Sequence, residues 1–185
     1  NTPLPDHTPV AVIGGGYAGR SAALSLARLG HKVTVLDAER IGWGASSRNG
    51  GMVSGGLKVA RTALAEKLGA EQARNIAMAA AASFPFIEET IAREGIECDY
   101  TRCGRFVAAW TPKHYDALAR QADYIADVTG LPTEMLPPSR QHEALGSDHY
   151  RGGMKAGATG SIHPGKYARG LAAAAERAGA KLVDY

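Results

Sequence analysis

Two short apolar runs near the start of the chain flank a stretch of small residues. Residues 9–13 and residues 33–36 contain repeated valines, as expected for strands buried in a sheet. Between them, residues 17–30 are mostly small and apolar, which is typical of a helix that packs closely on a sheet. The order strand, helix, strand predicts a βαβ unit, in which a helix connects two parallel strands.

Beyond residue 60 the pattern predicts further helices and strands. Residues 60–94 are rich in alanine, with apolar residues in loosely helical spacing. We expect Gly69 and Pro85 to break or kink this helix, since proline removes a helix hydrogen bond. For the middle of the chain we predict a strand over 105–110, an amphipathic helix over 112–129 closed by Gly130, and irregular chain over 132–150 with a turn at Pro137 and Pro138. After this we predict a short strand or hairpin within 150–162, a helix over 164–178 and a strand that starts at 181.

The turn after the first strand has the glycine spacing G-x-G-x-x-G, at Gly14, Gly16 and Gly19. Gly14 permits a tight turn, Gly16 lets the backbone approach a pyrophosphate, and Gly19 allows close packing of helix and strand. The start of the helix then offers unpaired N–H groups to phosphates. Asp37 ends the second strand, where it is placed to accept ribose hydroxyls. These features predict a dinucleotide site, and a glycine turn without a ligand is the alternative.

The acidic residue and the segment after it bear on which dinucleotide binds. Asp37 would repel the 2′-phosphate of NADP, whereas Arg40 reopens that option unless it is a solvated surface residue. NAD and FAD enzymes share the βαβ unit, so the next segment decides between them. Residues 41–52 are too rich in glycine and polar side chains for a helix or strand, and small residues let a loop lie against a flat ligand. A serine hydrolase is excluded, because Arg48 stands where its nucleophile motif needs a second glycine.

Residues 37–51, with the sequence DAERIGWGASSRNGG, closely resemble the flavin loop of the D-amino-acid oxidase (DAO) superfamily of FAD-dependent amine oxidoreductases. Within that superfamily the chain looks most like the gamma-glutamylputrescine oxidase branch. Residues 95–100, 104–105 and 160–167 also match. The resemblance covers nearly the whole chain from Val10 onward.

The resemblance implies that FAD is the cofactor. The residues implied for its binding lie in the glycine turn, after the second strand and in the flavin loop: Gly14, Gly15, Gly16, Tyr17, Ala18, Gly19, Asp37, Ala38, Arg40, Gly44, Ala45, Ser46, Ser47, Arg48, Asn49, Gly50, Gly51 and Met52. Asp37 replaces the more usual Glu, which shortens the reach to the ribose by one methylene. Ser47 stands where Gly is common, and Met52 where this branch often has Gln.

The resemblance also implies the domain organisation. It is an α/β architecture, with a Rossmann-like FAD-binding domain of the GR2/DAO type and part of a second, α+β substrate domain. We expect a flexible arm over 1–9, the first part of the FAD-binding domain over 10–97, part of the substrate domain over 98–161 and a return to the FAD-binding domain over 162–185. Family members are much longer, so we expect the chain to be the N-terminal part of an enzyme whose C-terminal half is missing.

By resemblance, the chain belongs to an amine oxidase. In the family mechanism a hydride passes from the amine-bearing carbon to the flavin, the imine hydrolyses to an aldehyde or keto acid, and dioxygen reoxidises the flavin with release of hydrogen peroxide. A small-molecule amine, such as a gamma-glutamyl-polyamine, and dioxygen are the implied partners. The alternatives are an amino-acid or sarcosine-type oxidase, a dehydrogenase of the same superfamily, and a non-catalytic cofactor-binding fragment.

His163 is the candidate for catalysis within this chain, at a domain crossover where a cleft is expected. A neutral imidazole there could orient an amine or carry a proton, and the alternative is a cap before Pro164. Arg102 and Arg105 flank a strand, where they either face a carboxylate substrate or are solvated. His142 and His149 lack metal-ligand spacing, and we expect no metal.

Composition and charge bear on the binding partners and the location of the protein. The formal net charge of +3 is small and the basic residues are scattered, which favours neither nucleic acid nor a membrane surface as a partner. No apolar run approaches the about 20 residues of a transmembrane helix. Cys98 and Cys103 have neither metal-ligand nor C-x-x-C spacing, and we interpret them as reduced thiols of a cytoplasmic protein.

Overall fold

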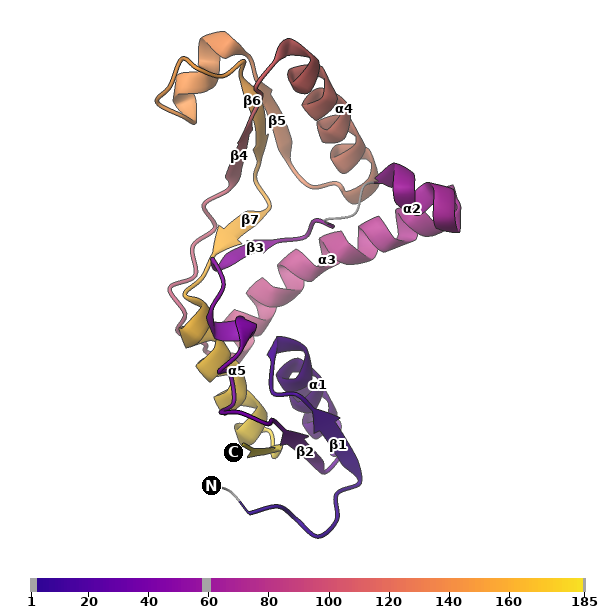
Figure 1. Ribbon diagram of the computed structural model, residues 1–185, viewed down its shortest axis with the longest axis vertical. Coiled ribbons are helices and arrows are strands. Elements are labelled where there is room, and N and C mark those ends of the chain that lie inside the picture. The colour runs from indigo at the N-terminus through magenta and orange to yellow at the C-terminus, as the bar shows by residue number, and fades with distance from the viewer. Residues whose placement is uncertain (1–2, 58–60, 185) are drawn as a thin grey trace. The chain divides into compact units, whose positions relative to one another are not determined.

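The computed structural model describes residues 3–57 and 61–184. The chain divides into two compact units, and it passes between them more than once (Figure 1). The first unit contains Asn1–Met52, Glu88–Tyr100 and Ile162–Tyr185, and the second contains Val53–Ile87 and Thr101–Ser161.

The first unit is built on a parallel sheet with the strand order β1-β2-β8. β1 (Val10–Ile13), β2 (Val33–Leu36) and β8 (Lys181–Val183) pair in register, with Val10 opposite Val33 and Thr34 opposite Lys181. The helices α1 (Tyr17–Arg28) and α5 (Pro164–Arg177) pack against each other. The central strand β2 is the most buried, as expected for a parallel strand covered on its faces. The predicted βαβ unit is confirmed.

Helix ends in both units follow the predicted end signals. α5 begins after His163 with Pro164 in its first turn, and Gly179 follows its end with a φ of +101°. In the second unit, α4 (Pro112–Thr129) begins after Thr111, whose side chain accepts a hydrogen bond from the amide of His114. α4 ends at Gly130, with a φ of +66°. A left-handed residue favours glycine because a Cβ would be strained there, so both ends were readable from the sequence.

The second unit is built on an antiparallel sheet with the order β4-β6-β5. β6 (Gly153–Ala156) is central, between β4 (Arg105–Ala108) and β5 (Thr133–Leu136), and α4 packs on β5 and β6. Its core is a cluster of Ala109, Leu118, Ala122 and Met154. β3 (Met52–Ser54) and β7 (Thr159–Ser161) form a separate pair.

The prediction of irregular chain over 132–150 is wrong over 133–143 and confirmed over 144–150. Residues 133–136 form β5, and a 3-10 helix follows over Pro138–Glu143. The strand was hidden because its stability comes from pairing with β6, which lies about twenty residues later and leaves no local signal. The predicted strand over 105–110 ends at Ala108. Strands within 150–162 are confirmed as β6 and β7, which belong to different sheets.

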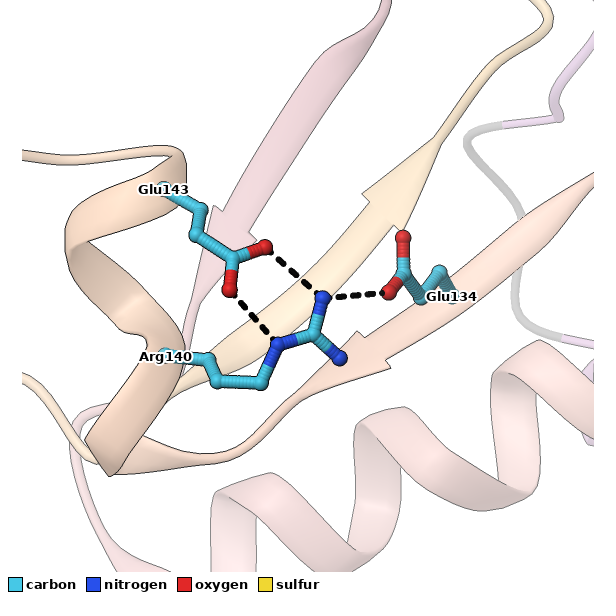
Figure 2. A network of polar contacts seen from close by, with 3 residues as sticks. All are labelled: Glu134, Arg140 and Glu143. Atoms are coloured by element: carbon cyan, nitrogen blue, oxygen red, sulfur yellow. Dashed lines mark hydrogen bonds and ion pairs between the residues drawn. The ribbon is translucent and has the colours of Figure 1, made fainter.

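Arg140 ties the 3-10 helix to β5 through two carboxylates (Figure 2). Its Nε lies 2.6 Å from Glu143 Oε1, and its Nη2 lies 2.7 Å from Glu143 Oε2 and 3.0 Å from Glu134 Oε1. The hydrogen bonds to Glu143 and Glu134 raise the pKa of Arg140, and the hydrogen bond from Arg140 lowers the pKa of Glu143. The network is exposed, so it contributes to local order more than to stability.

The alanine-rich stretch contains α2 (Arg61–Leu68) and α3 (Ala70–Glu94), separated by Gly69, and residue 60 lies outside the described residues. Gly69 breaks the helix as predicted, with a φ of +84°. Pro85, in contrast, lies inside α3 and does not end it. Proline leaves the carbonyl of Ala81 without its helical donor, and Gly55 lies beside that carbonyl, where a Cβ would be only 2.8 Å from the oxygen.

The compact units differ from the expected division in one stretch. Residues 53–87, expected with the first part of the FAD-binding domain, cluster with residues 101–161. The chain leaves the first unit directly after Met52, and it returns within α3, at Glu88. The assignment of one unit to the cofactor and the other to the substrate stays a prediction. Within the described ranges, no helix combines the length and the apolar character needed to cross a membrane.

Candidate functional site

The glycine turn after β1 depends on the absence of side chains. Gly14 has a φ of +96°, and its amide donates a 2.7 Å hydrogen bond to the carbonyl of Leu36. A Cβ at Gly19 would collide with the carbonyl oxygen of Gly14, so glycine allows α1 to start directly against the turn. A Cβ at Gly16 would lie 3.2 Å from Ser46 Oγ. The turn therefore brings bare backbone to the start of α1, as a pyrophosphate site requires.

Asp37 joins the end of β2 to this turn. Its Oδ2 accepts a 2.7 Å hydrogen bond from the amide of Gly15, and its Oδ1 accepts a 3.1 Å hydrogen bond from the amide of Glu39. A Cβ at Gly15 would contact the side chains of Ile41 and Asp37. An ionised carboxylate has about four acceptor positions, so two bonds leave capacity for ligand hydroxyls.

The loop over residues 41–51 is held by its own polar side chains. Ser47 Oγ donates to the carbonyl of Gly42 at 2.5 Å, and Asn49 Nδ2 donates to the carbonyl of Ala45 at 3.0 Å. Asn49 Oδ1 accepts from the amide of Gly51 at 2.9 Å. Apart from one 3-10 turn at Ala45–Ser47, the loop is neither helix nor strand, as predicted. Its shape is therefore specified by short polar side chains that close local turns.

Both ends of this loop are anchored to the rest of the first unit. The amide of Ile41 donates a 2.9 Å hydrogen bond to Asp184 Oδ2, just after β8. At the other end, the carbonyl of Gly51 accepts a 2.8 Å hydrogen bond from the amide of Ile162. Gly51 has a φ of +69°, and a Cβ there would collide with the carbonyl oxygen of Ile162. Glycine at this position is thus required by both conformation and space.

The loop also contacts the start of α1. Ser46 Oγ accepts a 3.0 Å hydrogen bond from the amide of Tyr17, so this helix amide is occupied by the protein itself. The guanidinium carbon of Arg48 lies 4.1 Å from the centre of the Trp43 ring, a cation–π contact within the loop. A Cβ at Gly44 or Gly50 would meet nothing within 4 Å, so the backbone is open there. The structure thus places the glycine turn, Asp37 and the loop in one region of the first unit.

Arg20 is part of this region and was missed by the sequence analysis. Its side chain is fully buried, although it carries a charge. Nε donates to the carbonyl of Gly16 at 3.2 Å, and Nη1 donates to the carbonyl of Ala168 at the start of α5. Desolvation lowers the pKa of Arg20, but guanidinium groups remain charged in proteins. The signal lay in the helical spacing, since position 20 falls on the buried stripe formed by Ala23, Leu24 and Ala27.

His163 occupies the N-cap position of α5. Its Nδ1 accepts a 3.3 Å hydrogen bond from the amide of Lys166, and its own amide donates to the carbonyl of Cys98 at 2.7 Å. This geometry matches the alternative interpretation of His163, a cap at the start of α5. The catalytic role of His163 stays a prediction.

A salt bridge lies next to this cap. Lys166 Nζ is 2.8 Å from both carboxylate oxygens of Asp99, and the hydrogen bond from Lys166 holds the pKa of Asp99 below its usual range. Asp99 has a φ of +54°, an uncommon conformation for a residue other than glycine. The contact fixes the chain just before it leaves the first unit at Tyr100.

The other charged candidates lie in the second unit. The guanidinium carbon of Arg102 lies 5.1 Å from the centre of the Phe84 ring, and Arg105 is exposed at the start of β4. His142 Nε2 lies 2.6 Å from Asp148 Oδ1 on the surface. Across residues 3–57 and 61–184, no group of three or more His, Cys, Asp or Glu side chains is arranged to hold a metal ion.

Comparisons with known proteins identify the family of the chain. The family model described as "FAD dependent oxidoreductase" (DAO) matches residues 9–185. The chain is 34% identical to gamma-glutamylputrescine oxidoreductase of Escherichia coli over 175 residues, which are 95% of this chain and 41% of that protein. It is 30% identical to the probable oxidoreductase OrdL of Haemophilus influenzae over 179 residues, which are 97% of this chain and 42% of that protein.

Among solved structures, the chain is similar to the crystal structure of glycine oxidase from Geobacillus kaustophilus. The TM-score is 0.74 at 28% sequence identity, over 95% of this chain and 46% of that one. The chain thus spans about two fifths of the length of the curated relatives above and a little less than half of this structure.

Proposed function

Because the chain belongs to the DAO family of FAD-dependent oxidoreductases, we propose that its first compact unit holds FAD with the residues of the glycine turn, Asp37 and the loop. The turn from Gly14 to Gly19 receives the pyrophosphate, since it offers bare backbone at a helix start. Asp37 accepts hydroxyls of the adenosine ribose with the lone pairs that its two amide bonds leave free. The loop over residues 41–51 lies along the remainder of the cofactor.

Three observations support this fit. The carbonyl of Gly14 occupies the space of a Cβ at Gly19, so the turn cannot be filled by a larger residue. The exposed backbone at Gly44 and Gly50 leaves room for a flat group beside the loop. Arg20 adds a positive charge behind the turn, which favours an anionic ligand.

We propose that the protein carrying this chain oxidises an amine of the gamma-glutamylputrescine type. Bound FAD supplies the oxidant that accepts a hydride from the amine-bearing carbon, and dioxygen restores it with release of hydrogen peroxide. The resulting imine takes up water and gives an aldehyde and ammonia. The single observation that carries this proposal is the 34% identity to gamma-glutamylputrescine oxidoreductase over 95% of the chain.

A second candidate is an oxidase of amino acids. It is favoured by the similarity to glycine oxidase of Geobacillus kaustophilus, which is 29% identical over 179 residues. The two candidates differ in whether the substrate carries a carboxylate beside the amine. Arg105 is an exposed cation of the second unit that would suit such a carboxylate, whereas in gamma-glutamylputrescine the carboxylate lies at the glutamyl end, far from the amine that is oxidised.

Within this chain, His163 is the proposed proton carrier. Its Nδ1 accepts from the amide of Lys166, which orients the imidazole and places the proton of the neutral ring on Nε2. Deprotonation of the substrate ammonium is the step that would need this group, since hydride leaves readily only when the nitrogen lone pair is free. The proton would be taken up at Nδ1, so the imidazole would release the amide of Lys166 as it accepts it.

We also propose a cytoplasmic location. Cys98 is buried and Cys103 is exposed, and both are free thiols. Free thiols are the rule in a reducing compartment, where disulfides are rare.

Anaerobic mixing of the purified holoprotein with single substrates tests the function. We expect gamma-glutamylputrescine to bleach the flavin absorbance, and glycine, sarcosine and D-amino acids to leave it unchanged. Admission of air should then restore the absorbance and release hydrogen peroxide. Bleaching by amino acids alone would favour the second candidate, and bleaching by no substrate would indicate a cofactor-binding protein without turnover.

A further inference from the structure

The guanidinium of Arg20 is buried beneath the first turn of α1 without a charged partner at hydrogen-bond distance. The side chain has no exposure to solvent. Its two hydrogen bonds go to the backbone carbonyls of Gly16 and Ala168, which are neutral acceptors. Nη2 has no hydrogen-bond partner within the described part of the chain. The positive charge is therefore only partly satisfied by the protein.

This placement is unfavourable for the protein alone. A buried cation loses its hydration and is normally retained only when it is paired. The start of α1 adds the positive end of a helix dipole at the same place. Arginine cannot relieve this by losing its proton, because its pKa is too high even when burial lowers it. A negative charge is needed nearby.

The acidic and phenolic groups around Arg20 supply this charge only in part. Asp37 attracts Arg20, but both of its oxygens are hydrogen-bonded to the amides of Gly15 and Glu39. The rings of Tyr17 and Tyr167 lie close to the guanidinium, and they are neutral at physiological pH. Arg20 Nη2 still has no partner among the described residues, and an anionic ligand at the turn would add negative charge beside the guanidinium.

We propose that Arg20 is a buried counter-charge for the pyrophosphate of the cofactor, and thus a positioning residue of the cofactor site. This inference rests on the proposed placement of FAD at the glycine turn. Gly16 connects Arg20 to the cofactor site. Its carbonyl accepts a hydrogen bond from Arg20 Nε, and its bare Cα faces Ser46 of the loop. Gly42 borders the same guanidinium, because a Cβ there would lie 3.4 Å from Nη1. Arg20 therefore acts on the cofactor through the glycine turn and the loop.

A purely structural role would not need the charge. Arg20 links α1 to α5 through its bond to Ala168, but an apolar side chain of similar length could fill the same space. Replacement of a buried ion by an apolar residue of similar volume is often neutral or stabilising. Retention of the charge is explained when a ligand of opposite charge binds beside it.

The test compares ligands that differ in their phosphates, on the apo form of the full protein that carries this chain. Binding of FAD, ADP and adenosine is measured by calorimetry for the wild type and for Arg20→Met, which keeps the length and removes the charge. We expect Arg20→Met to weaken FAD and ADP about tenfold or more and to leave adenosine within about twofold, because only the first two carry a pyrophosphate. The melting temperature of the apo variant should equal or exceed that of the wild type.

Two further variants sharpen the comparison. Arg28→Met makes the same chemical change on the same helix at a partly exposed site, and it should leave all three affinities unchanged. Arg20→Gln is neutral but keeps an N–H donor for the buried carbonyls, and it should lose ADP affinity as Arg20→Met does. It also replaces Arg20→Met in the test if that variant fails to fold.

Equal weakening of ADP and adenosine would overturn the proposal, because it would indicate a structural role. Unchanged ADP affinity in both neutral variants would overturn it as well. A wild-type apoprotein that binds neither FAD nor ADP would instead overturn the placement of the cofactor at the glycine turn, and this inference with it.

Discussion

The amide of Gly15 donates a 2.7 Å hydrogen bond to the carboxylate of Asp37, 22 residues later in the chain. The bond holds the glycine turn against the end of β2, and the second carboxylate oxygen receives the amide of Glu39. The acid at the end of β2 therefore shapes the turn in addition to the ribose contact that we propose. One substitution should affect both roles.

Asp37→Ala should weaken FAD binding about tenfold or more, since hydrogen bonds to a charged group contribute about 1.5–3 kcal/mol. The free energy of unfolding of the apoprotein should fall as well, because the amides of Gly15 and Glu39 lose their acceptor. Fluorescence titration of the apoprotein with FAD measures the first effect and urea unfolding the second. Glu39→Ala removes an exposed carboxylate two residues away and serves as the control. Equal FAD affinities for Asp37→Ala and wild type would contradict this prediction.

Gly19→Ala should destabilise the first unit by about 1–3 kcal/mol, the usual cost of adding atoms to a packed site. The new Cβ would meet the carbonyl of Gly14 and lie 3.2 Å from Val12 Cγ1, so the helix and the turn would have to separate. Gly146→Ala is the matched control, because a Cβ there meets nothing within 4 Å. Urea unfolding of the two variants should give clearly different midpoints; coincident midpoints would rule out the close approach at Gly19.

His163→Ala should lower the free energy of unfolding by about 1 kcal/mol through loss of the N-cap, and His163→Asn should restore it. Turnover of His163→Asn then reports on chemistry separately from stability. A fall in turnover of about 100-fold, with an unchanged flavin spectrum, is expected if the imidazole carries a proton. An unchanged rate would restrict His163 to its role as a cap.

Tyr167 should make the stability of the protein depend on alkaline pH. Burial raises the pKa of its phenol to about 12, from about 10 in an exposed tyrosine. The neutral phenol is thus favoured in the folded state. Its contribution is complete below pH 10 and is lost as the pH rises toward 12, because only the unfolded chain ionises in that window.

The size of this effect can be isolated with one variant. At pH 11 the unfolding free energy should have lost about 1 kcal/mol through this residue. Tyr167→Phe removes the hydroxyl and should show a correspondingly smaller decrease between pH 9 and 11 in guanidinium unfolding. Parallel curves for wild type and Tyr167→Phe would show that Tyr167 ionises normally.

The features predicted from the sequence are those set by local backbone rules. Gly14 and Gly130 adopt positive φ angles, and Gly19 has no room for a side chain, so each residue type indicated its own environment. The helix over Pro112–Thr129 was readable for the same reason, since a proline stands in its first turn and a glycine directly follows its last residue. The family was likewise readable from one contiguous loop.

The features that were missed depend on contacts between distant segments. β5 exists through its pairing with β6, which no local pattern records. Pro85 does not break α3, and the alternative that it kinks the helix stays a prediction. Arg20 was overlooked because a charged residue in a helix is usually solvated, and its burial follows from the approach of α5.

The internal hydrogen bonds of Ser47 and Asn49 have a consequence for how quickly and how tightly a ligand is taken up. Fixing the backbone of one residue costs about 1–2 kcal/mol in conformational entropy. Residues 41–51 lose this conformational entropy already when the protein folds, because side chains of the loop form hydrogen bonds with its own carbonyls and amides. A cofactor that docks on a preorganised loop retains more of its interaction energy as affinity, and its association does not wait for the loop to become ordered.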